Sequence, residues 1–122
     1  MKKLLLALPF SILLTACGSD SVEDIAHQYC LDVKQMNFNG ARELALDSVV
    51  SNRQAMYEQN KGKYSMVFGS QNCNVTKIEE DGIDRTAYFG GSKLDSVMLE
   101  FSEEEDRYIV VVDAFKNDLK LY

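Results

Sequence analysis

Few side chains of the kind that carry metal or enzymatic chemistry are present in this sequence. It has one histidine, His27, and three cysteines without a Cys-x-x-Cys pair. A structural zinc site normally needs four such ligands, so we expect no zinc site. The acidic run Glu103–Asp106 lacks the spacing and glycine of a calcium loop, which indicates a solvated hairpin tip. Serine-nucleophile motifs, phosphate loops and dinucleotide fingerprints are also absent, which predicts a non-enzymatic protein without a cofactor.

A long hydrophobic run is missing as well. The apolar stretch Leu4–Leu14 has eleven residues and contains Pro9, whereas a membrane-spanning helix needs about 20. A basic start, this short run and the sequence Leu14-Thr15-Ala16-Cys17 instead match the signal and cleavage box of a bacterial lipoprotein. We therefore predict that residues 1–16 are removed, that Cys17 is lipidated and that residues 17–20 form a tether. An ordinary secretory signal with a coincidental cysteine is the alternative.

The residue after Cys17 indicates whether the lipid anchor is in the inner or the outer membrane. Lipoprotein sorting in Gram-negative bacteria treats Asp at this position as a signal to stay in the inner membrane, and here the residue is Gly18. The resemblance therefore implies a lipid anchor in the outer membrane, with the domain facing the periplasm. Three acyl chains should make this attachment effectively permanent.

Positive charge is scarce once the signal segment is removed. Because Lys2 and Lys3 lie in that segment, the remaining chain has 11 basic and 19 acidic side chains and a net charge of −8. This balance excludes a broad basic surface for nucleic acid. It is also common in extracytoplasmic domains, where net charge maintains solubility.

The two cysteines that remain after lipidation are Cys30 and Cys73. In a compartment that oxidises thiols, they are expected to form one disulfide. A catalytic redox role is not expected, because neither cysteine has the motif or surroundings of a reactive thiolate.

Periodicity predicts helices in the first half of the chain. Apolar residues recur at helical spacing across Ser21–Met36, and Ser21 with Asp24 fits a capping box. The run Asn37–Gly40 is expected to end this helix and to cap a second one from about Ala41. Val49 and Val50 are expected to break that helix before a third, short one that begins at Ser51 and continues through Asn60.

The second half of the chain is predicted to form strands. Residues 61–63 should end the last helix, and a period of two follows from Tyr64, with Cys73 and Val75 in the first strand. A turn at residues 80–82 and strands at 83–89, 97–101 and 108–115 complete the pattern, and the last strand is apolar enough to be central. We therefore predict one α+β domain over residues 21–122, in which N-terminal helices pack on a curved antiparallel sheet of three to four strands.

The order of these elements resembles that of a known group of proteins. Ser21–Met36, the corner Asn37–Ala41 and the strand series that ends in Tyr108–Ala114 look similar to small bacterial lipoproteins of unknown function with a cystatin-like fold. More specifically, they resemble the cone-shaped fold of nuclear transport factor and ketosteroid isomerase. The resemblance implies a long first helix across a bent sheet, often with a pocket between them.

Tyr29 and Asp113 are the candidate residues for such a pocket. Alternation places Asp113 on one strand face with Ile109, Val111 and Phe115, and an acid among apolar neighbours has a raised pKa. Tyr29 lies on the apolar face of the first helix, and the resemblance implies that such a pair can polarise a carbonyl. The competing interpretation is that both residues only pack in the structure.

His27 shares a helix face with Glu23 and Lys34, away from the apolar residues. It is expected to be a solvated surface histidine, because a catalytic imidazole needs an orienting partner in a concave site.

The sequence thus favours a lipid-anchored envelope protein that binds a protein partner through its sheet face or sheet edge. One alternative is a small-ligand carrier or sensor with Tyr29 and Asp113 in its pocket. Another is an immunity lipoprotein that neutralises a cationic toxin, suggested by the acidic charge.

Overall fold

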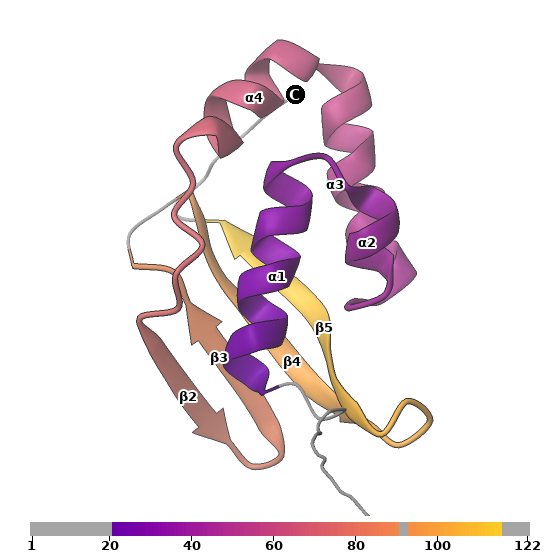
Figure 1. Ribbon diagram of the computed structural model, residues 1–122, viewed down its shortest axis with the longest axis vertical. Coiled ribbons are helices and arrows are strands. Elements are labelled where there is room, and N and C mark those ends of the chain that lie inside the picture. Colours follow the sequence, from indigo (N-terminus) through magenta and orange to yellow (C-terminus); the bar gives the residue numbers. More distant parts are fainter. Residues whose placement is uncertain (1–20, 91–92, 116–122) are drawn as a thin grey trace, which may run out of the picture.

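The chain folds into helices followed by an antiparallel sheet, as the computed structural model shows for residues 21–90 and 93–115 (Figure 1). The helices are α1 (Val22–Lys34), α2 (Phe38–Arg42), α3 (Asp47–Gln59) and α4 (Lys61–Gly69), and the strands are β2 (Lys77–Asp81), β3 (Asp84–Tyr88), β4 (Leu94–Ser102) and β5 (Arg107–Phe115). The predicted α+β class is confirmed. No helix in the described ranges has the length and apolar character needed to cross a membrane.

Helix α1 begins where the sequence predicts. The Ser21 hydroxyl accepts a hydrogen bond from the Asp24 backbone N–H at 3.1 Å, which satisfies one of the free donors of the first turn. At the other end, Met36 has a φ of +60°, and Asn37 caps α2 by accepting from the Gly40 N–H at 3.1 Å. The corner between the helices is therefore built by Met36 and Asn37 together.

The helices after this corner differ from those predicted. Helix α2 begins at Phe38 and ends at Arg42, so a second helix from about Ala41 is wrong. Val49 and Val50 lie inside α3, and they do not break a helix. Both are buried at their positions in the first turns of α3, so their apolar side chains pack against the core without interrupting the helix.

A strand from Tyr64 is also wrong, because α4 covers residues 61–69. The Asn60 side chain caps this helix by accepting from the Lys63 N–H at 3.0 Å. Tyr64, Val67 and Phe68 are buried, and their spacing of three and four is helical. The pair Asn60 and Lys61 therefore starts a helix where the run Lys61–Lys63 was expected to end one.

The four strands form a meander in the order β2-β3-β4-β5. Strands β2 and β3 pair as a hairpin in which Asp81 faces Asp84, so the turn is Gly82-Ile83, one residue later than predicted. Gly82 has a φ of +64°, the left-handed conformation that such tight turns need. Cys73 and Val75 precede the sheet and belong to no strand.

Strand β5 lies at one end of this order, so its predicted central position is wrong. Its outer edge is covered by the chain between α2 and α3. The Val110 N–H donates to the Leu44 carbonyl at 2.9 Å, and the Leu46 N–H donates to the Val110 carbonyl at 3.0 Å. Ala45 thereby forms a parallel bridge to Val110. This short bridge accounts for the apolar character that suggested a central strand.

A β-bulge in β5 changes which residues face the helices. Leu99 of β4 is opposite Val110, but the next residue, Met98, is opposite Val112. Val111 is the extra residue, so the alternation is interrupted there. The prediction that Asp113 shares a face with Ile109 and Val111 is therefore wrong. Asp113 faces the helices together with the fully buried Val110.

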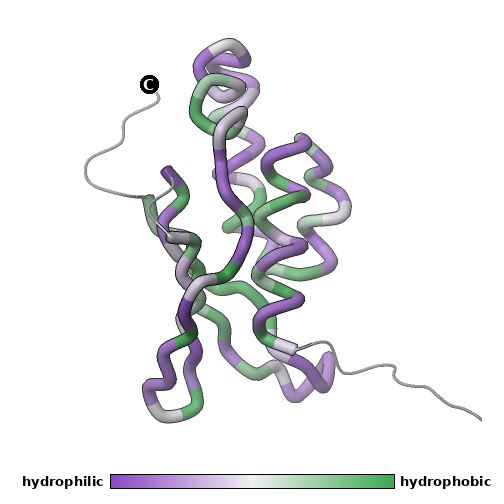
Figure 2. Tube along the Cα trace, turned by 60° about the vertical axis from the view of Figure 1, so that its left-hand side comes forward, coloured by the Kyte–Doolittle hydropathy of each residue, from purple (hydrophilic) through white to green (hydrophobic). Residues whose placement is uncertain are grey.

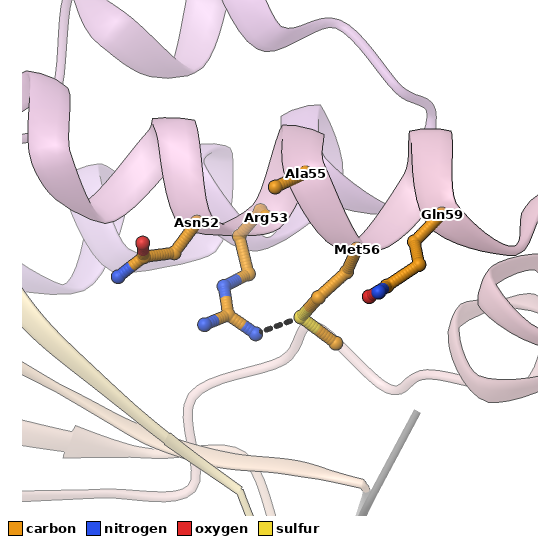
Figure 3. A pocket seen from close by; sticks show the side chains of 5 residues that line it. All are labelled: Asn52, Arg53, Ala55, Met56 and Gln59. Atoms are coloured by element: carbon orange, nitrogen blue, oxygen red, sulfur yellow. Dashed lines mark hydrogen bonds between the residues drawn. The ribbon is translucent and has the colours of Figure 1, made fainter. Parts of the chain in front are cut away.

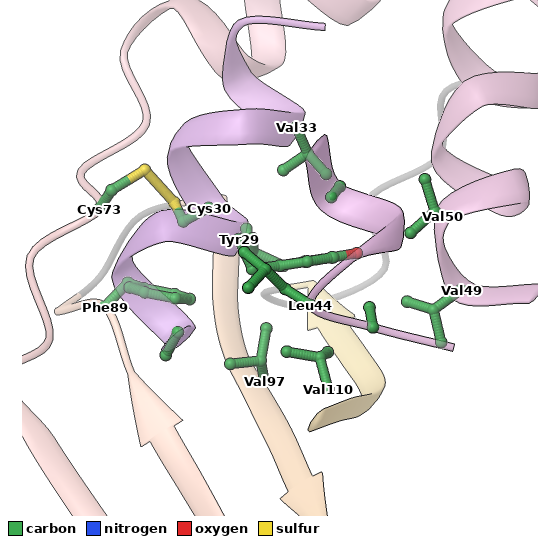
Figure 4. Close-up of a cluster of buried hydrophobic side chains, with 14 of the residues drawn as sticks. Tyr29, Cys30, Val33, Leu44, Val49, Val50, Cys73, Phe89, Val97 and Val110 are labelled. Atoms are coloured by element: carbon green, nitrogen blue, oxygen red, sulfur yellow. A yellow bond between two sulfur atoms is a disulfide. The ribbon is translucent and has the colours of Figure 1, made fainter. Parts of the chain in front are cut away.

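The core lies between the helices and one face of the sheet. Figure 2 shows the helices on a single side of the strands, and Figure 4 shows the buried side chains of α1 meeting those of the sheet. Tyr29, Phe89, Leu94, Val97 and Leu99 are among the fully enclosed residues. The opposite face of the sheet is not covered by any of the described helices.

The predicted disulfide joins Cys30 of α1 to Cys73, with the two Cα atoms 5.5 Å apart (Figure 4). It fixes the connection between α4 and β2 along α1. Lys34 Nζ donates to the Gln71 carbonyl at 3.0 Å on the same side of the helix. The buried amide of Gln71 in turn donates to the Leu94 carbonyl and accepts from the Leu94 N–H, which ties this connection to the sheet.

Candidate functional site

Tyr29 and Asp113, the two candidate pocket residues, meet in the structure. The Tyr29 hydroxyl donates a hydrogen bond to Asp113 Oδ2 at 2.9 Å. The Tyr29 residue is 0% exposed and the Asp113 side chain is 5% exposed. The contact forms because α1 crosses the sheet at β5 and because the bulge at Val111 turns Asp113 toward that helix.

Sequence reasoning missed the third member of this cluster, Arg53 of α3. Its Nε lies 3.2 Å from Asp113 Oδ2, and its side chain is 12% exposed. The guanidinium also lies over the Phe115 ring, 4.7 Å from the centroid, and contacts the Met56 sulfur. Tyr29, Arg53 and Asp113, here called the buried triad, therefore connect α1, α3 and β5.

The electrostatics of the buried triad are set by burial. Burial raises the pKa of Asp113 above its usual value, although the charge of Arg53 and the Tyr29 hydrogen bond oppose that rise. Burial also raises the pKa of Tyr29, and the nearby Asp113 charge adds to this effect. Tyr29 therefore stays protonated and remains a hydrogen-bond donor at any ordinary pH.

The geometry of the buried triad suits a structural role. The Tyr29 hydroxyl and Arg53 both address the same carboxylate oxygen, so the buried charge has both a donor and a counterion. A catalytic pair would need one polar group free to meet a substrate. Here the polar groups of Tyr29 and Asp113 are bonded to each other under the surface.

The described surface has several hollows, and one of them reaches the buried triad at Arg53. One, of about 250 Å³, runs along α3 and is lined by Asn52, Arg53, Ala55, Met56 and Gln59 (Figure 3). Figure 3 shows the amides of Asn52 and Gln59 on either side of Arg53 and Met56. Another, of about 220 Å³, lies beside the start of β2 and is lined by Glu23, Val75, Thr76, Lys77 and Ile78.

His27 is not the solvated surface residue that was predicted. Its Nδ1 lies 2.7 Å from the Cys73 carbonyl oxygen, and the residue is half-buried. His27 is three residues before Cys30 on α1. The disulfide that holds Cys73 against α1 therefore also holds the Cys73 carbonyl beside His27. A third hollow, of about 350 Å³, is lined here by Glu23, Asp24, His27, Asn74 and Val75.

The sheet face opposite the described helices carries side chains from three strands. Thr86, Met98 and Val112 are aligned across β3, β4 and β5. Val112 is 46% exposed, whereas Thr86 and Met98 are partly buried. Tyr88, Ser96 and Ala114 form the neighbouring row, in which Ser96 is buried. We call these two rows the outer face. The members of a row point to the same side of the sheet, opposite to the buried Ala87 and Val97.

Two sequence predictions concern metal binding and the lipid anchor. Within residues 21–90 and 93–115, no group of three His, Cys, Asp or Glu side chains could hold a metal ion. Cys17 and the signal segment lie outside the described residues.

The chain matches no protein-family model, no curated protein and no solved structure.

Proposed function

We propose that this protein is a non-enzymatic, lipid-anchored module of the bacterial cell envelope that binds a protein partner through its outer face. The observation that carries the proposal is that the described helices all pack on one side of the sheet (Figure 2), whereas Met98 and Val112 are side by side on the other. Antiparallel sheets can have one solvated face, but that face is then normally polar. The apolar pair with its exposed member, Val112, is therefore the place on this face where we expect a partner to pack.

The envelope location is supported by the disulfide between Cys30 and Cys73. Structural disulfides persist outside the cytoplasm and are rare within it. The lipoprotein signal that ends at Cys17 gives the same compartment. The finer resemblance, to the cystatin-like cone, is part of the proposal and is supported by a first helix that crosses an antiparallel sheet.

The buried triad argues against the pocket alternative. A carrier that used Tyr29 and Asp113 would present at least one of their polar groups to its ligand. Instead, the hydroxyl donates to the carboxylate, and the carboxylate is also ion-paired with Arg53. This contact explains why two polar groups occur between α1 and the sheet without requiring a ligand.

Site-specific photo-crosslinking in living cells tests the proposal. A photoreactive amino acid is placed at Val112 or at Ala114 of the full-length lipoprotein, and adducts are identified by mass spectrometry. Met66 of α4 is the control position, because it is apolar, 78% exposed and on a helix, not on the outer face of the sheet. We expect one envelope protein to be attached at Val112 and Ala114 and none at Met66.

The same experiment can refute the proposal. Equal adducts at Val112 and Met66 would mean random encounters, and no adduct at Val112 or Ala114 would exclude a partner on this face. A Cys17→Ser variant adds a test of the anchor, since a released domain should lose most of its adduct. Unchanged adduct yield in that variant would show that the lipid is not needed for binding.

A further inference from the structure

The charges around the outer face have a definite arrangement. Strand pairing places Asp81 opposite Asp84, and Asp84 next to Glu100, one position beyond the pair Arg85 and Leu99. These three carboxylates, here called the acidic row, run across β2, β3 and β4. They lie beside the apolar row of Thr86, Met98 and Val112, at a distance of about 7 Å along the strands.

The acidic row brings like charges onto neighbouring strands. Like charges directly opposite each other on neighbouring strands destabilise a sheet. One cation on this side of the sheet, Lys77, is already occupied, because its Nζ lies 3.2 Å from Glu79 and 4.8 Å from the Tyr88 ring centroid. Tyr88 also donates to Glu79, and this hydrogen bond holds the pKa of Glu79 below its usual value. Among the described residues, no salt bridge involves the acidic row, which therefore adds negative charge beside Met98 and Val112.

We propose that the outer face docks a cationic, apolar segment of a resident envelope protein, with its apolar side chains on Met98 and Val112 and its Lys or Arg side chains on the acidic row. This inference rests on the proposed function and names the chemistry of the partner. Cationic side chains relieve the repulsion within the acidic row, and the apolar side chains cover the exposed row beside it.

Charge complementarity favours a cationic segment over two other possible occupants of the outer face, a second copy of the chain and an anionic lipid surface. A second copy of the chain brings another surplus of carboxylates and a Lys77 that is already paired with Glu79. An anionic lipid surface likewise brings negative charge toward Asp84 and Glu100. Only a segment with positive charge gains from the acidic row as well as from the apolar row.

The first test uses a labelled peptide of alternating leucine and lysine as the probe, with a leucine and glutamate peptide as its counterpart. Binding to the full lipidated protein in detergent is followed by fluorescence anisotropy. The variant D84N/E100Q removes two carboxylates of the acidic row. The control E103Q/E104Q changes the net charge equally but acts at the exposed β4–β5 turn, outside that row.

We expect the lysine peptide to bind and the glutamate peptide not to bind. D84N/E100Q should weaken binding by about 5- to 10-fold, as the loss of two surface ion pairs implies, whereas E103Q/E104Q should change it by less than about 2-fold. Equal losses in the two variants would mean general charge attraction, and equal binding of the two peptides would mean no charge selection. Either result overturns the inference.

The second test returns to crosslinking at Val112 in cells, with the same two variants. We expect the attached protein to have Lys or Arg beside the crosslinked residue, and its adduct to decrease in D84N/E100Q but not in E103Q/E104Q. An attached protein with an acidic or neutral segment overturns this inference and leaves the proposed function standing. If the attached chain is a second copy of this protein, or residues 116–122 of the same chain, both the inference and the proposed function are overturned. The absence of any adduct has the same consequence.

Discussion

Tyr29 could be selected from the sequence because helical periodicity places it on the apolar face of α1. Asp113 was selected by an alternation with Ile109 and Val111 that the strand does not keep. The two side chains are nevertheless in contact, at 2.9 Å. The bulge at Val111 could not be predicted, because an extra residue in an apolar strand leaves no compositional mark. Arg53 could not be found either, since a single arginine in a polar helix looks solvated until α3 is packed against β5.

Removal of the Tyr29 hydroxyl should destabilise the fold. In Tyr29→Phe, the Asp113 carboxylate loses a buried hydrogen bond, and a bond to a charged group contributes about 2 kcal/mol. Urea unfolding of the variant measures this loss. Tyr108→Phe is the matched control, because Tyr108 is only half-buried and its ring packs against Phe101. Equal stabilities for wild type and Tyr29→Phe would contradict the structural role of the hydrogen bond.

Removal of Arg53 should have an effect that depends on pH. In Arg53→Met, the buried Asp113 loses its counterion, which costs about 3 kcal/mol when the carboxylate is ionised. The folded pKa of Asp113 is already above its unfolded value of 3.8, and it should rise further without Arg53. Folding then favours the protonated acid, so stability is retained below pH 3.8 and lost as pH rises through the folded pKa.

Unfolding curves of Arg53→Met and wild type over a range of pH check this sign. The difference between the two proteins should be largest near neutral pH and should shrink in acid. The double variant R53M/D113N removes the buried charge and should recover part of the stability at neutral pH. A difference that does not change with pH, and that persists in the double variant, would mean that Arg53 acts through packing alone.

Among the elements, α1 was predicted most accurately because its cap, its apolar stripe and its stop all agree. The later helices were predicted less well. In α3 and α4 the apolar residues are clustered and do not form a regular stripe, so a local break and a helix interior look alike in the sequence. The positions of α3 and α4 depend on the parts of the fold that these helices cover. Tyr64 shows this, because its hydroxyl donates to the Val33 carbonyl of α1 at 2.6 Å.

The disulfide between α1 and the segment before β2 should contribute strongly to stability. Cys30 and Cys73 are 43 residues apart, and closing such a loop lowers the entropy of the unfolded chain by an amount equivalent to about 4 kcal/mol. Reduction should therefore lower the unfolding temperature markedly and should add two hydrogens to the mass. The variant C30S/C73S should behave like the reduced protein, and a reductant should not affect it.

In the described residues, the helices lie on one side of the sheet and leave its other face without a helix, and only the helical side could be anticipated. The order of helices and strands predicts that helices cover a sheet. Whether they cover one face or both depends on where α2, α3 and α4 turn after α1, which local patterns do not specify. The functional proposal therefore depends on a feature of the assembled fold that no motif in the chain records.

The position of the domain in the cell should depend on the residue after the lipidated cysteine. If Cys17 carries the anchor, Gly18 permits transfer to the outer membrane, and Gly18→Asp should retain the protein in the inner membrane. Density-gradient separation of the two membranes measures the distribution, with Gly18→Ser as the control that should stay in the outer membrane. The variant domain keeps its fold, because Gly18 precedes the Ser21 cap of α1.

If the partner resides at the outer membrane, Gly18→Asp should also abolish the adduct at Val112. An adduct that survives relocation would place the partner in the inner membrane or free in the periplasm.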